Sequence, residues 1–181
     1  MENVSKKTNT LAKLGILAAI SVVLVAIVHF PLIPAAAFLE YDPADVPILL
    51  GTFALGPAAG LLLTVVASVI QGLTVSASSG WYGILMHVIA TGTYVLVAGN
   101  IYKAHKTKKQ AILALVCGTL AMAAVMVPAN LLITPIFMGA PRSAVAAMIP
   151  TAILPFNFLK AGINSVITFL LYKRVSPLLH K

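Results

Sequence analysis

Long apolar segments separated by short polar ones make up most of this chain. An apolar segment of about 20 residues is long enough to cross the hydrocarbon core of a membrane as a helix. We predict six such spans, at residues 11–29, 44–56, 57–75, 80–102, 110–138 and 150–173. Only the turn around Gly56-Pro57 separates the short second span from the third. The fifth contains Pro128 and Pro135, so we expect it to kink or break.

The charged residues are few, and they are sorted by position. The chain is 60% hydrophobic and 9% charged, whereas soluble domains carry about 25% charged residues. With six spans, 10 of the 12 basic residues share one face with both termini: Lys6, Lys7, Lys13, Lys103, Lys106, Lys108, Lys109, Lys173, Arg174 and Lys181. Basic loops mark the cytoplasmic side. This topology accounts for the net charge of +8 without any nucleic-acid partner.

These patterns predict an all-α membrane protein, with residues 1–181 forming one integral-membrane domain. Both termini are expected in the cytoplasm. The chain lacks the G-x-x-x-x-G-K-[ST] motif of P-loop ATPases and the H-E-x-x-H motif of zinc proteases. We therefore expect no catalytic residues, no metal site and no cofactor. No internal repeat is evident, which disfavours a symmetric secondary transporter.

The first loop, residues 30–47, is long, rich in proline and partly apolar. We expect this extracellular loop to pack over the outer end of the bundle as a lid, since lids exclude water and complete a binding site. Two acidic residues at its end, Asp42 and Asp45, have a simpler alternative role. Either carboxylate could cap the start of the second span.

Three polar residues lie on one face of the predicted sixth span. Asn157, Lys160 and Asn164 are spaced at i, i+3 and i+7, as on one side of a helix. Lys160 would lie on the order of 10–15 Å below the outer helix end, where an unpaired charge is unfavourable. Either it snorkels to the headgroups, or it points into a cavity and donates to a ligand. In a cavity it could also pair with Asp42 or Asp45.

Two further polar side chains are candidates for the same cavity. Asn130 lies beside the helix break predicted at Pro128, and His87 lies in the fourth span. The alternative for His87 is a packed histidine without a ligand. In the first span, Gly15 and Ala19 are small residues four apart, which lets another helix approach closely. That helix could belong to a partner or to this chain.

Two stretches resemble a known family. Phe38-Leu-Glu-Tyr-Asp-Pro-Ala-Asp-Val-Pro-Ile-Leu49, followed by Phe53-Ala-Leu-Gly-Pro-Ala-Ala-Gly60, resembles the first loop and second span of the S components of energy-coupling factor (ECF) transporters. Pro155-Phe-Asn-Phe-Leu-Lys160 resembles a sixth-span motif of the same superfamily. Chain length, span number and sidedness also agree with it.

This resemblance implies a high-affinity substrate-binding subunit of an ABC-type importer, with its cavity open to the outside beneath the first loop. It implies binding residues Glu40, Tyr41 and Asp42 in the loop and Asn130, Asn157, Lys160, Asn164 and His87 in the spans. The implied partners are a vitamin, membrane lipids, the transmembrane coupling protein EcfT and two ATPase subunits. Gly15 and Ala19 resemble the small-residue motif that docks on the coupling protein.

Among S components, the riboflavin-binding type is the most similar in pattern. Its sixth span carries an asparagine and a lysine three apart, matched by Asn157 and Lys160, and its fifth carries an asparagine, matched by Asn130. The chain departs from that type in lacking a lysine in the third span and in having His87 where an asparagine is expected. Pantothenate, pyridoxine and hydroxymethylpyrimidine remain alternative ligands.

Two hypotheses of another class also remain. One is a membrane enzyme that modifies a lipid, using Asp42, Asp45 and His87. The other is a small homo-oligomeric channel, which needs a polar path through the whole membrane. The polar residues of this chain converge at the outer end instead, which favours a binding subunit.

Overall fold

The computed structural model describes the backbone of residues 2–179 and the side chains of residues 7–172 and Arg174. The basic side chains predicted at Lys6, Lys173 and Lys181 lie outside those described. Seven α-helices make up most of the fold: α1 (Glu2–Ile27), α2 (Asp45–Leu55), α3 (Pro57–Leu73), α4 (Gly80–Ala104), α5 (Lys108–Met138), α6 (Arg142–Met148) and α7 (Leu154–Leu179). The short elements are β1 (Phe30–Pro31), η1 (Pro34–Ala36), β2 (Glu40–Tyr41), η2 (Ala77–Ser79) and the π-helical turn η3 (Ile149–Ile153).

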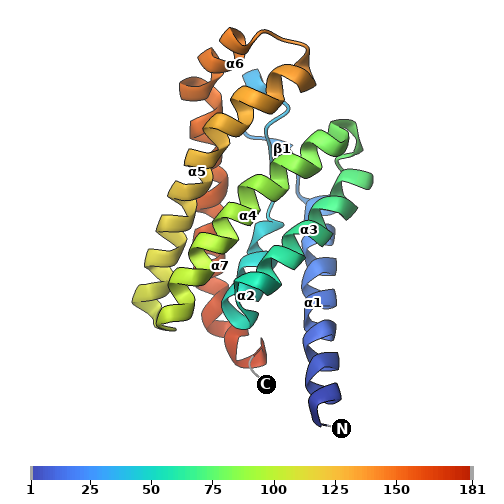
Figure 1. Ribbon diagram of the computed structural model, residues 1–181, viewed down its shortest axis with the longest axis vertical. Helices are drawn as coiled ribbons and strands as arrows, with labels where there is room; N and C mark the ends of the chain where they lie inside the picture. The colour runs from blue at the N-terminus through green and yellow to red at the C-terminus, as the bar shows by residue number, and fades with distance from the viewer. Residues whose placement is uncertain (1, 180–181) are drawn as a thin grey trace.

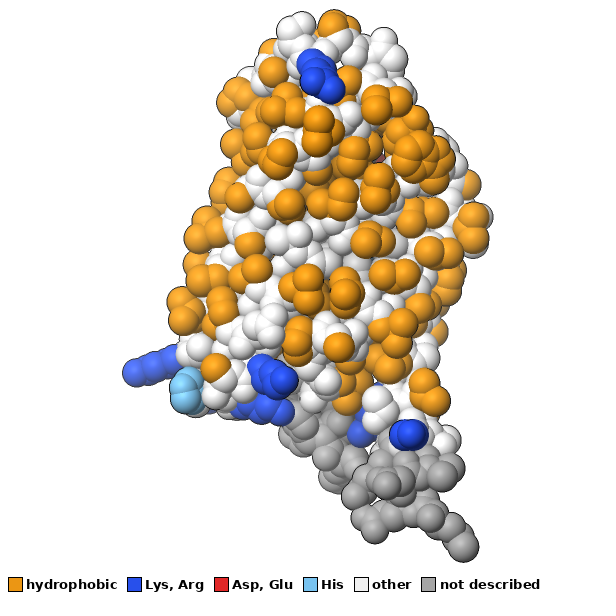
Figure 2. Space-filling model, in the orientation of Figure 1, with side chains coloured by type: hydrophobic (Ala, Val, Ile, Leu, Met, Phe, Trp, Pro, Cys, Tyr) orange, Lys and Arg blue, Asp and Glu red, His pale blue; other side chains and the backbone are white. Residues whose placement is uncertain are grey.

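The helices form an elongated bundle, with both chain ends and the α4–α5 turn at its lower end in Figure 1. Helix α6 and the segment between α1 and α2 lie in its upper part. Apolar side chains cover most of the face in Figure 2, whereas basic side chains gather at the lower end. This distribution is typical of a protein surrounded by lipid.

Within the described residues, four segments are long and apolar enough to cross a membrane: Lys7–Ile27, Ala77–Ala104, Lys108–Met138 and Arg142–Tyr172. Helices α2 and α3 are the two shorter apolar helices. Helices therefore occupy all six predicted spans. The break between the second and third was predicted correctly: Gly56 adopts φ +99°, and Pro57 begins α3. Positive φ is readily available to glycine, and proline is tolerated at the first position of a helix.

Two predictions about the elements need correction, and a third is decided between its two expected outcomes. The first loop contains a small antiparallel pair, β1 with β2, so the fold is mostly rather than entirely helical. Helix α5 continues through Pro128 and Pro135 to Met138, and its upper part leans away from its lower part in Figure 1. Of the two expected outcomes, the helix therefore kinks and does not break. The last membrane segment starts at Arg142 rather than at residue 150, because α6 and η3 continue directly into α7.

Helix α2 lies at the centre of the bundle, since every residue from Asp45 to Ala54 is buried. Glycines let neighbouring helices come close: a Cβ on Gly118 of α5 would lie 2.2 Å from the ring of Tyr94 of α4. Near the lower end, the rings of Phe53 and Tyr102 stack with centroids 4.4 Å apart, and the Tyr102 hydroxyl is bonded to that of Tyr172. Close packing of this kind holds the helices in one arrangement.

A second apolar cluster fixes the first loop on the upper end of the bundle. Ala36 and Leu39 of the loop pack with Val145 of α6, Ile153 of η3 and Phe156 of α7. The cluster is separate from the main core. The loop therefore rests on the α6–η3–α7 segment, where it covers the polar residues of α7.

Candidate functional site

The site is built around a buried ion pair. The Nζ atom of Lys160 lies 2.7 Å from Oδ2 of Asp42, and both side chains are less than 10% exposed. Lys160 comes from α7 and Asp42 from the end of the first loop. The lysine therefore does not snorkel to the membrane surface, and its predicted pairing with a loop carboxylate is confirmed. Pairing is what makes a buried charge tolerable.

The second oxygen of Asp42 holds the backbone that leads into α2. Its Oδ1 atom accepts a hydrogen bond from the backbone N–H of Ala44 at 3.0 Å. Ala44 is the N-cap residue of α2, and its side chain makes no capping bond. Asp42 therefore orders the turn before α2 and pairs with Lys160 at the same time. The capping role expected for Asp45 is wrong, because its side chain bonds to other helices.

Asp45 is fully buried and joins the start of α2 to α4 and α7 directly, and to α3 through His87. Its Oδ1 atom accepts a hydrogen bond from Thr91 of α4 at 2.7 Å and lies 3.2 Å from Nε2 of His87, also on α4. Its Oδ2 atom accepts from Nδ2 of Asn164 on α7 at 3.2 Å. His87 in turn contacts the Ser68 hydroxyl of α3 through Nδ1, at 2.9 Å. This chain of bonds satisfies a carboxylate that would be costly to bury alone.

Asn164 of α7 is hydrogen-bonded to the first loop next to the ion pair. Besides bonding Asp45, its Nδ2 donates to the backbone oxygen of Asp42 at 3.1 Å, and its Oδ1 accepts from the Tyr41 hydroxyl at 3.1 Å. Burial raises the pKa of the Tyr41 phenol, and the nearby carboxylates of Asp42 and Asp45 raise it further against the opposing effect of Lys160. The phenol therefore stays protonated and keeps its role as donor to Asn164.

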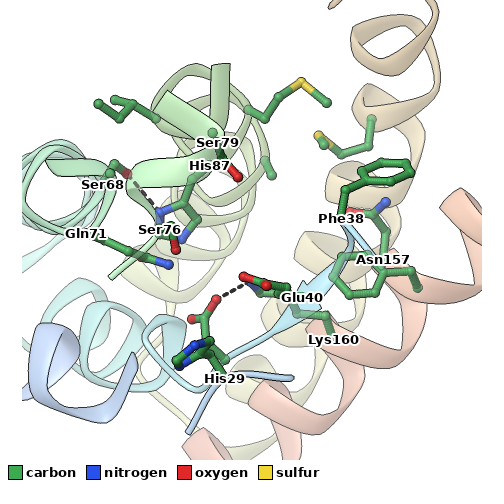
Figure 3. Close-up of a pocket in the computed structure, with 18 of the residues that line it drawn as sticks. His29, Phe38, Glu40, Ser68, Gln71, Ser76, Ser79, His87, Asn157 and Lys160 are labelled. Carbon is green, nitrogen blue, oxygen red and sulfur yellow. Dashed lines mark hydrogen bonds and ion pairs between the residues drawn. The ribbon is translucent and has the colours of Figure 1, made fainter. Parts of the chain in front are cut away.

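A cavity of about 150 Å³ lies above this network, beneath the loop. Figure 3 shows polar side chains entering it from α3 and α4 on one side, and from the loop and α7 on the other. Its polar lining comprises His29, Glu40, Asp42, Ser68, Gln71, Ser76, Ser79, His87, Asn157 and Lys160. Its larger apolar lining residues are Phe38, Ile84, Met86, Met122, Met126 and Phe156. Apolar walls with a few convergent polar groups are typical of small-molecule sites.

One buried polar atom at this cavity has no hydrogen-bond partner in the part of the chain described. The Oε1 atom of Gln71 is buried and unpaired, and its side chain extends toward the middle of the cavity in Figure 3. A buried acceptor without a donor is unfavourable by about 1–3 kcal/mol. A ligand N–H or O–H group would satisfy it.

A second, smaller cavity of about 90 Å³ adjoins the first. It contains Asn130 and Thr134 of α5 and Tyr82 of α4, whose ring stacks on that of Trp81. Both cavities share Phe38, Ser79, Gly83 and Met86 as lining residues. The side chains between them, Phe38 and Met86, separate one polar region from the other.

Five of the eight predicted binding residues line the main cavity: Glu40, Asp42, His87, Asn157 and Lys160. Asn130 borders the second cavity, with its amide bonded to Met126 and Thr134. Tyr41 and Asn164 line neither cavity and instead support the residues that do. Their assignment as contact residues is therefore not supported by the geometry.

Sequence reasoning missed the network centred on Asp45 and gave no role to Ser68. Asp45 and Ser68 lie in segments whose polar residues do not repeat at helical spacing, so no pattern there marks a site. Thr91 was missed for the same reason, since a lone threonine in an apolar helix is commonplace. The polar residues of α7 were found because three of them repeat on one helix face.

The predicted docking residues lie far from this site, on α1. Gly15 and Ala19 are exposed, and a Cβ on Gly15 would meet no atom within 4 Å. Their close approach to another helix of this chain, the alternative considered for them, is therefore wrong. The pair remains available to a partner.

Known proteins resemble the chain along nearly its whole length. The family model described as "ECF transporter, substrate-specific component" matches residues 9–172. A riboflavin transporter, RibU, of Staphylococcus aureus is 28% identical over 97% of this chain and 95% of its own. RibU of Streptococcus thermophilus is 32% identical over 96% and 86%, and riboflavin transporter FmnP of Bacillus subtilis 27% over 94% of each.

A solved structure points to the same family. The S component of a bacterial ECF transporter superposes with a TM-score of 0.84, at 29% identity, over 97% of this chain and 99% of that one. The family match, these relatives and the shared fold agree with a cavity that is closed by a loop and lined from α3, α4 and α7. The chain therefore belongs to the substrate-specific components of ECF transporters.

Proposed function

We propose that this chain binds riboflavin with high affinity in the cavity beneath the first loop, as the substrate-binding subunit of an ECF importer. The observation that carries the proposal is the buried ion pair of Lys160 and Asp42 at a cavity also lined by Asn157. Three riboflavin transporters that are 27–32% identical over most of the chain support the choice of ligand.

The lining suits a flat ring with a polar edge. Lys160 and Asn157 supply donors for the carbonyl oxygens and ring nitrogens of a flavin, and Gln71 Oε1 supplies an acceptor for an N–H or hydroxyl group. Phe38 and Phe156 offer apolar surfaces for the faces of the ring. A ligand carbonyl near Lys160 would share the ammonium with Asp42, so the charge would stay paired.

Binding also requires the loop to move. Sites for ligands of this size usually measure about 300 Å³ or more, and the main cavity measures about 150 Å³. Phe38 of the loop and Met86 separate it from the second cavity. We infer that displacement of Phe38 joins the two cavities, and that the loop then closes over the ligand as a lid.

The chain is a multi-pass protein of the bacterial cell membrane, and we propose that it crosses that membrane six times. Helices α2 and α3 supply the second and third crossings, as one domain with the other helices. The basic residues at the lower end of the bundle favour a cytoplasmic location for both termini. The binding cavity then lies at the extracellular side.

Energy for transport would come from partners. We propose assembly with the transmembrane coupling protein and two ATPase subunits, through a surface that includes Gly15 and Ala19. Helix α1 is only sparsely buried by this chain, since only 22% of its most apolar 18-residue stretch lies inside the bundle. An exposed pair of small residues on such a helix suits close helix packing.

The proposal is tested by purifying the full chain in detergent, recording its absorbance and identifying the released small molecules by mass spectrometry. Titration with riboflavin, pantothenate, pyridoxine and hydroxymethylpyrimidine would follow. A yellow protein that releases riboflavin, or tight binding of riboflavin alone, is expected. Tight binding of another vitamin would retain the transport role and change the ligand. Turnover of a lipid, or conductance by the isolated chain, would contradict both.

A further inference from the structure

An apolar groove runs along the outside of the bundle between α5 and α7. Its walls are two rows of side chains spaced four residues apart: Ile112, Val116 and Leu120 on α5, and Phe158, Val166 and Leu170 on α7. Each of these six side chains is exposed. The row on α7 also contains Gly162, whose missing side chain deepens the groove, because a Cβ there would meet no atom within 4 Å.

The hydroxyl groups at the floor of the groove already have hydrogen-bond partners within the chain. Its two hydroxyl residues, Thr119 and Ser165, are bonded to each other at 3.2 Å, and Ser165 also donates to the backbone oxygen of Ala161. Ser165 is further bonded to the Tyr94 hydroxyl. A hollow of about 440 Å³ with its polar atoms satisfied from within suits an apolar occupant.

The length of the groove matches one leaflet. At 1.5 Å per residue, the row on α5 spans about 12 Å and that on α7 about 18 Å. Half of a hydrocarbon core is about 15 Å. One acyl chain, extended along the helices, would occupy most of the groove, since the α5 row is shorter than one leaflet and the α7 row exceeds it by only about 3 Å.

Both rows end in a basic residue at the lower end of the bundle. Lys108 precedes Ile112 by four residues on α5, and Arg174 follows Leu170 by four residues on α7. Each row therefore continues for one more turn into an exposed cation. Glu40, Asp42 and Asp45 lie at the opposite end of the bundle, so no acidic side chain of that group neutralises the two cations. This charge suits an anionic headgroup of the cytoplasmic leaflet.

We propose that the α5–α7 groove is a binding site for an anionic phospholipid of the cytoplasmic leaflet. One acyl chain lies in the groove over Gly162, and Lys108 and Arg174 hold the phosphate of the headgroup. The site is distinct from the vitamin cavity and does not depend on which vitamin is transported, whereas its placement in the cytoplasmic leaflet rests on the proposed topology.

Native mass spectrometry of the full chain in detergent tests the site. The probes are a phosphatidylglycerol and a phosphatidylcholine with the same two oleoyl chains, added in equal amounts. The wild-type chain is expected to retain phosphatidylglycerol in preference. Lys108→Gln and Arg174→Gln should each lower that preference about five-fold. Lys109→Gln is the matched control, since it removes the same charge one position away from the row and should leave the preference unchanged.

Filling the groove tests the acyl-chain site separately. Gly162→Leu should abolish most retention of both lipids while thermal unfolding stays as in the wild type. Should that variant fail to fold, Val116→Trp fills the same groove from α5. Unchanged lipid retention in the filled variants, or an equal effect of Lys109→Gln and Lys108→Gln, would overturn the proposal. Loss of assembly with the coupling protein at unchanged lipid retention would assign the groove to a protein partner instead.

Discussion

The Lys160 ammonium lies 2.7 Å from a carboxylate oxygen of Asp42, although 118 residues separate the two in the chain. This pair joins the first loop to α7 at the floor of the cavity. Removal of one member leaves the other charge buried without a partner. Such a loss destabilises a protein much more than removal of both.

Lys160→Met should therefore lower both stability and affinity. We expect a loss of about 3 kcal/mol in the free energy of unfolding and a decrease in riboflavin affinity on the order of 100-fold. The double variant Lys160→Met/Asp42→Asn should recover most of the stability and none of the affinity. Thermal unfolding in detergent and a riboflavin titration measure the two quantities. A single variant that binds riboflavin normally would remove Lys160 from the site.

Two asparagines on the same face of α7 should differ in effect. Among the described residues, Asn157 lines the main cavity and its side chain bonds only to Ile153 one turn earlier. Asn164 lines neither of the two cavities described above and holds Tyr41, Asp42 and Asp45. Asn157→Ala should weaken riboflavin binding by about ten-fold or more at nearly unchanged stability. Asn164→Ala should mainly lower the melting temperature, because Asn164 holds the loop and the start of α2 in place. The reverse pattern would exchange the roles of the two residues.

Gln71→Leu should lower riboflavin affinity without lowering the stability of the fold. The buried Oε1 atom has no partner among the described residues, so its replacement by a methyl group should leave the melting temperature unchanged or raise it. Affinity for riboflavin should decrease about ten-fold, because the ligand loses an acceptor. Equal affinity in the variant would show that Gln71 does not contact the ligand.

Gly15→Leu and Ala19→Leu should weaken assembly with the coupling protein and spare riboflavin binding. The added side chains meet open space on α1 in the isolated chain, but they would block close approach of another helix. Co-purification with the coupling protein measures the effect. Ala144→Leu is the matched control, since that alanine is also small and exposed and lies on α6, away from α1. Normal assembly of both α1 variants would place the docking surface elsewhere.

Gly118→Ala should destabilise the bundle by about 1–3 kcal/mol. Its Cβ would lie 2.2 Å from the ring of Tyr94, and that ring is fully buried and fixed by its bond to Ser165. Gly162→Ala provides the comparison, because no atom lies within 4 Å of the added group. Thermal unfolding of both variants checks the difference. Equal melting temperatures of the two variants would mean that α4 and α5 can move apart at this point without a loss of stability.

Much of the helical framework could be predicted from the sequence, because apolar length and the Gly56-Pro57 turn depend on local composition. The α7 face was also predictable, since Asn157, Lys160 and Asn164 repeat at helical spacing. The partner of Lys160 could only be narrowed to two carboxylates. The choice of Asp42 over Asp45 depends on how the loop enters α2, which no local pattern specifies.

The individual hydrogen bonds around Asp45 could not be predicted, although Asp45, His87 and Asn164 were each candidates for the site. They join Thr91 and His87 of α4 to Asn164 of α7 through one carboxylate. Such contacts follow from the packing of helices that are distant in sequence. Helix α5 was predicted to kink or break, because proline removes one backbone hydrogen bond locally. The helix leans but does not break, since other groups in a membrane bundle can satisfy the freed backbone carbonyl.

The stacked pair Trp81 and Tyr82 gives this protein a built-in optical reporter. Trp81 is the single tryptophan of the chain, and Tyr82 beneath it lines the smaller cavity. Indole emits in the range in which flavins absorb, so a flavin arriving beside Tyr82 would quench that emission by energy transfer. Occupancy could then be followed in unlabelled protein, in detergent or in vesicles, from the fluorescence of one residue.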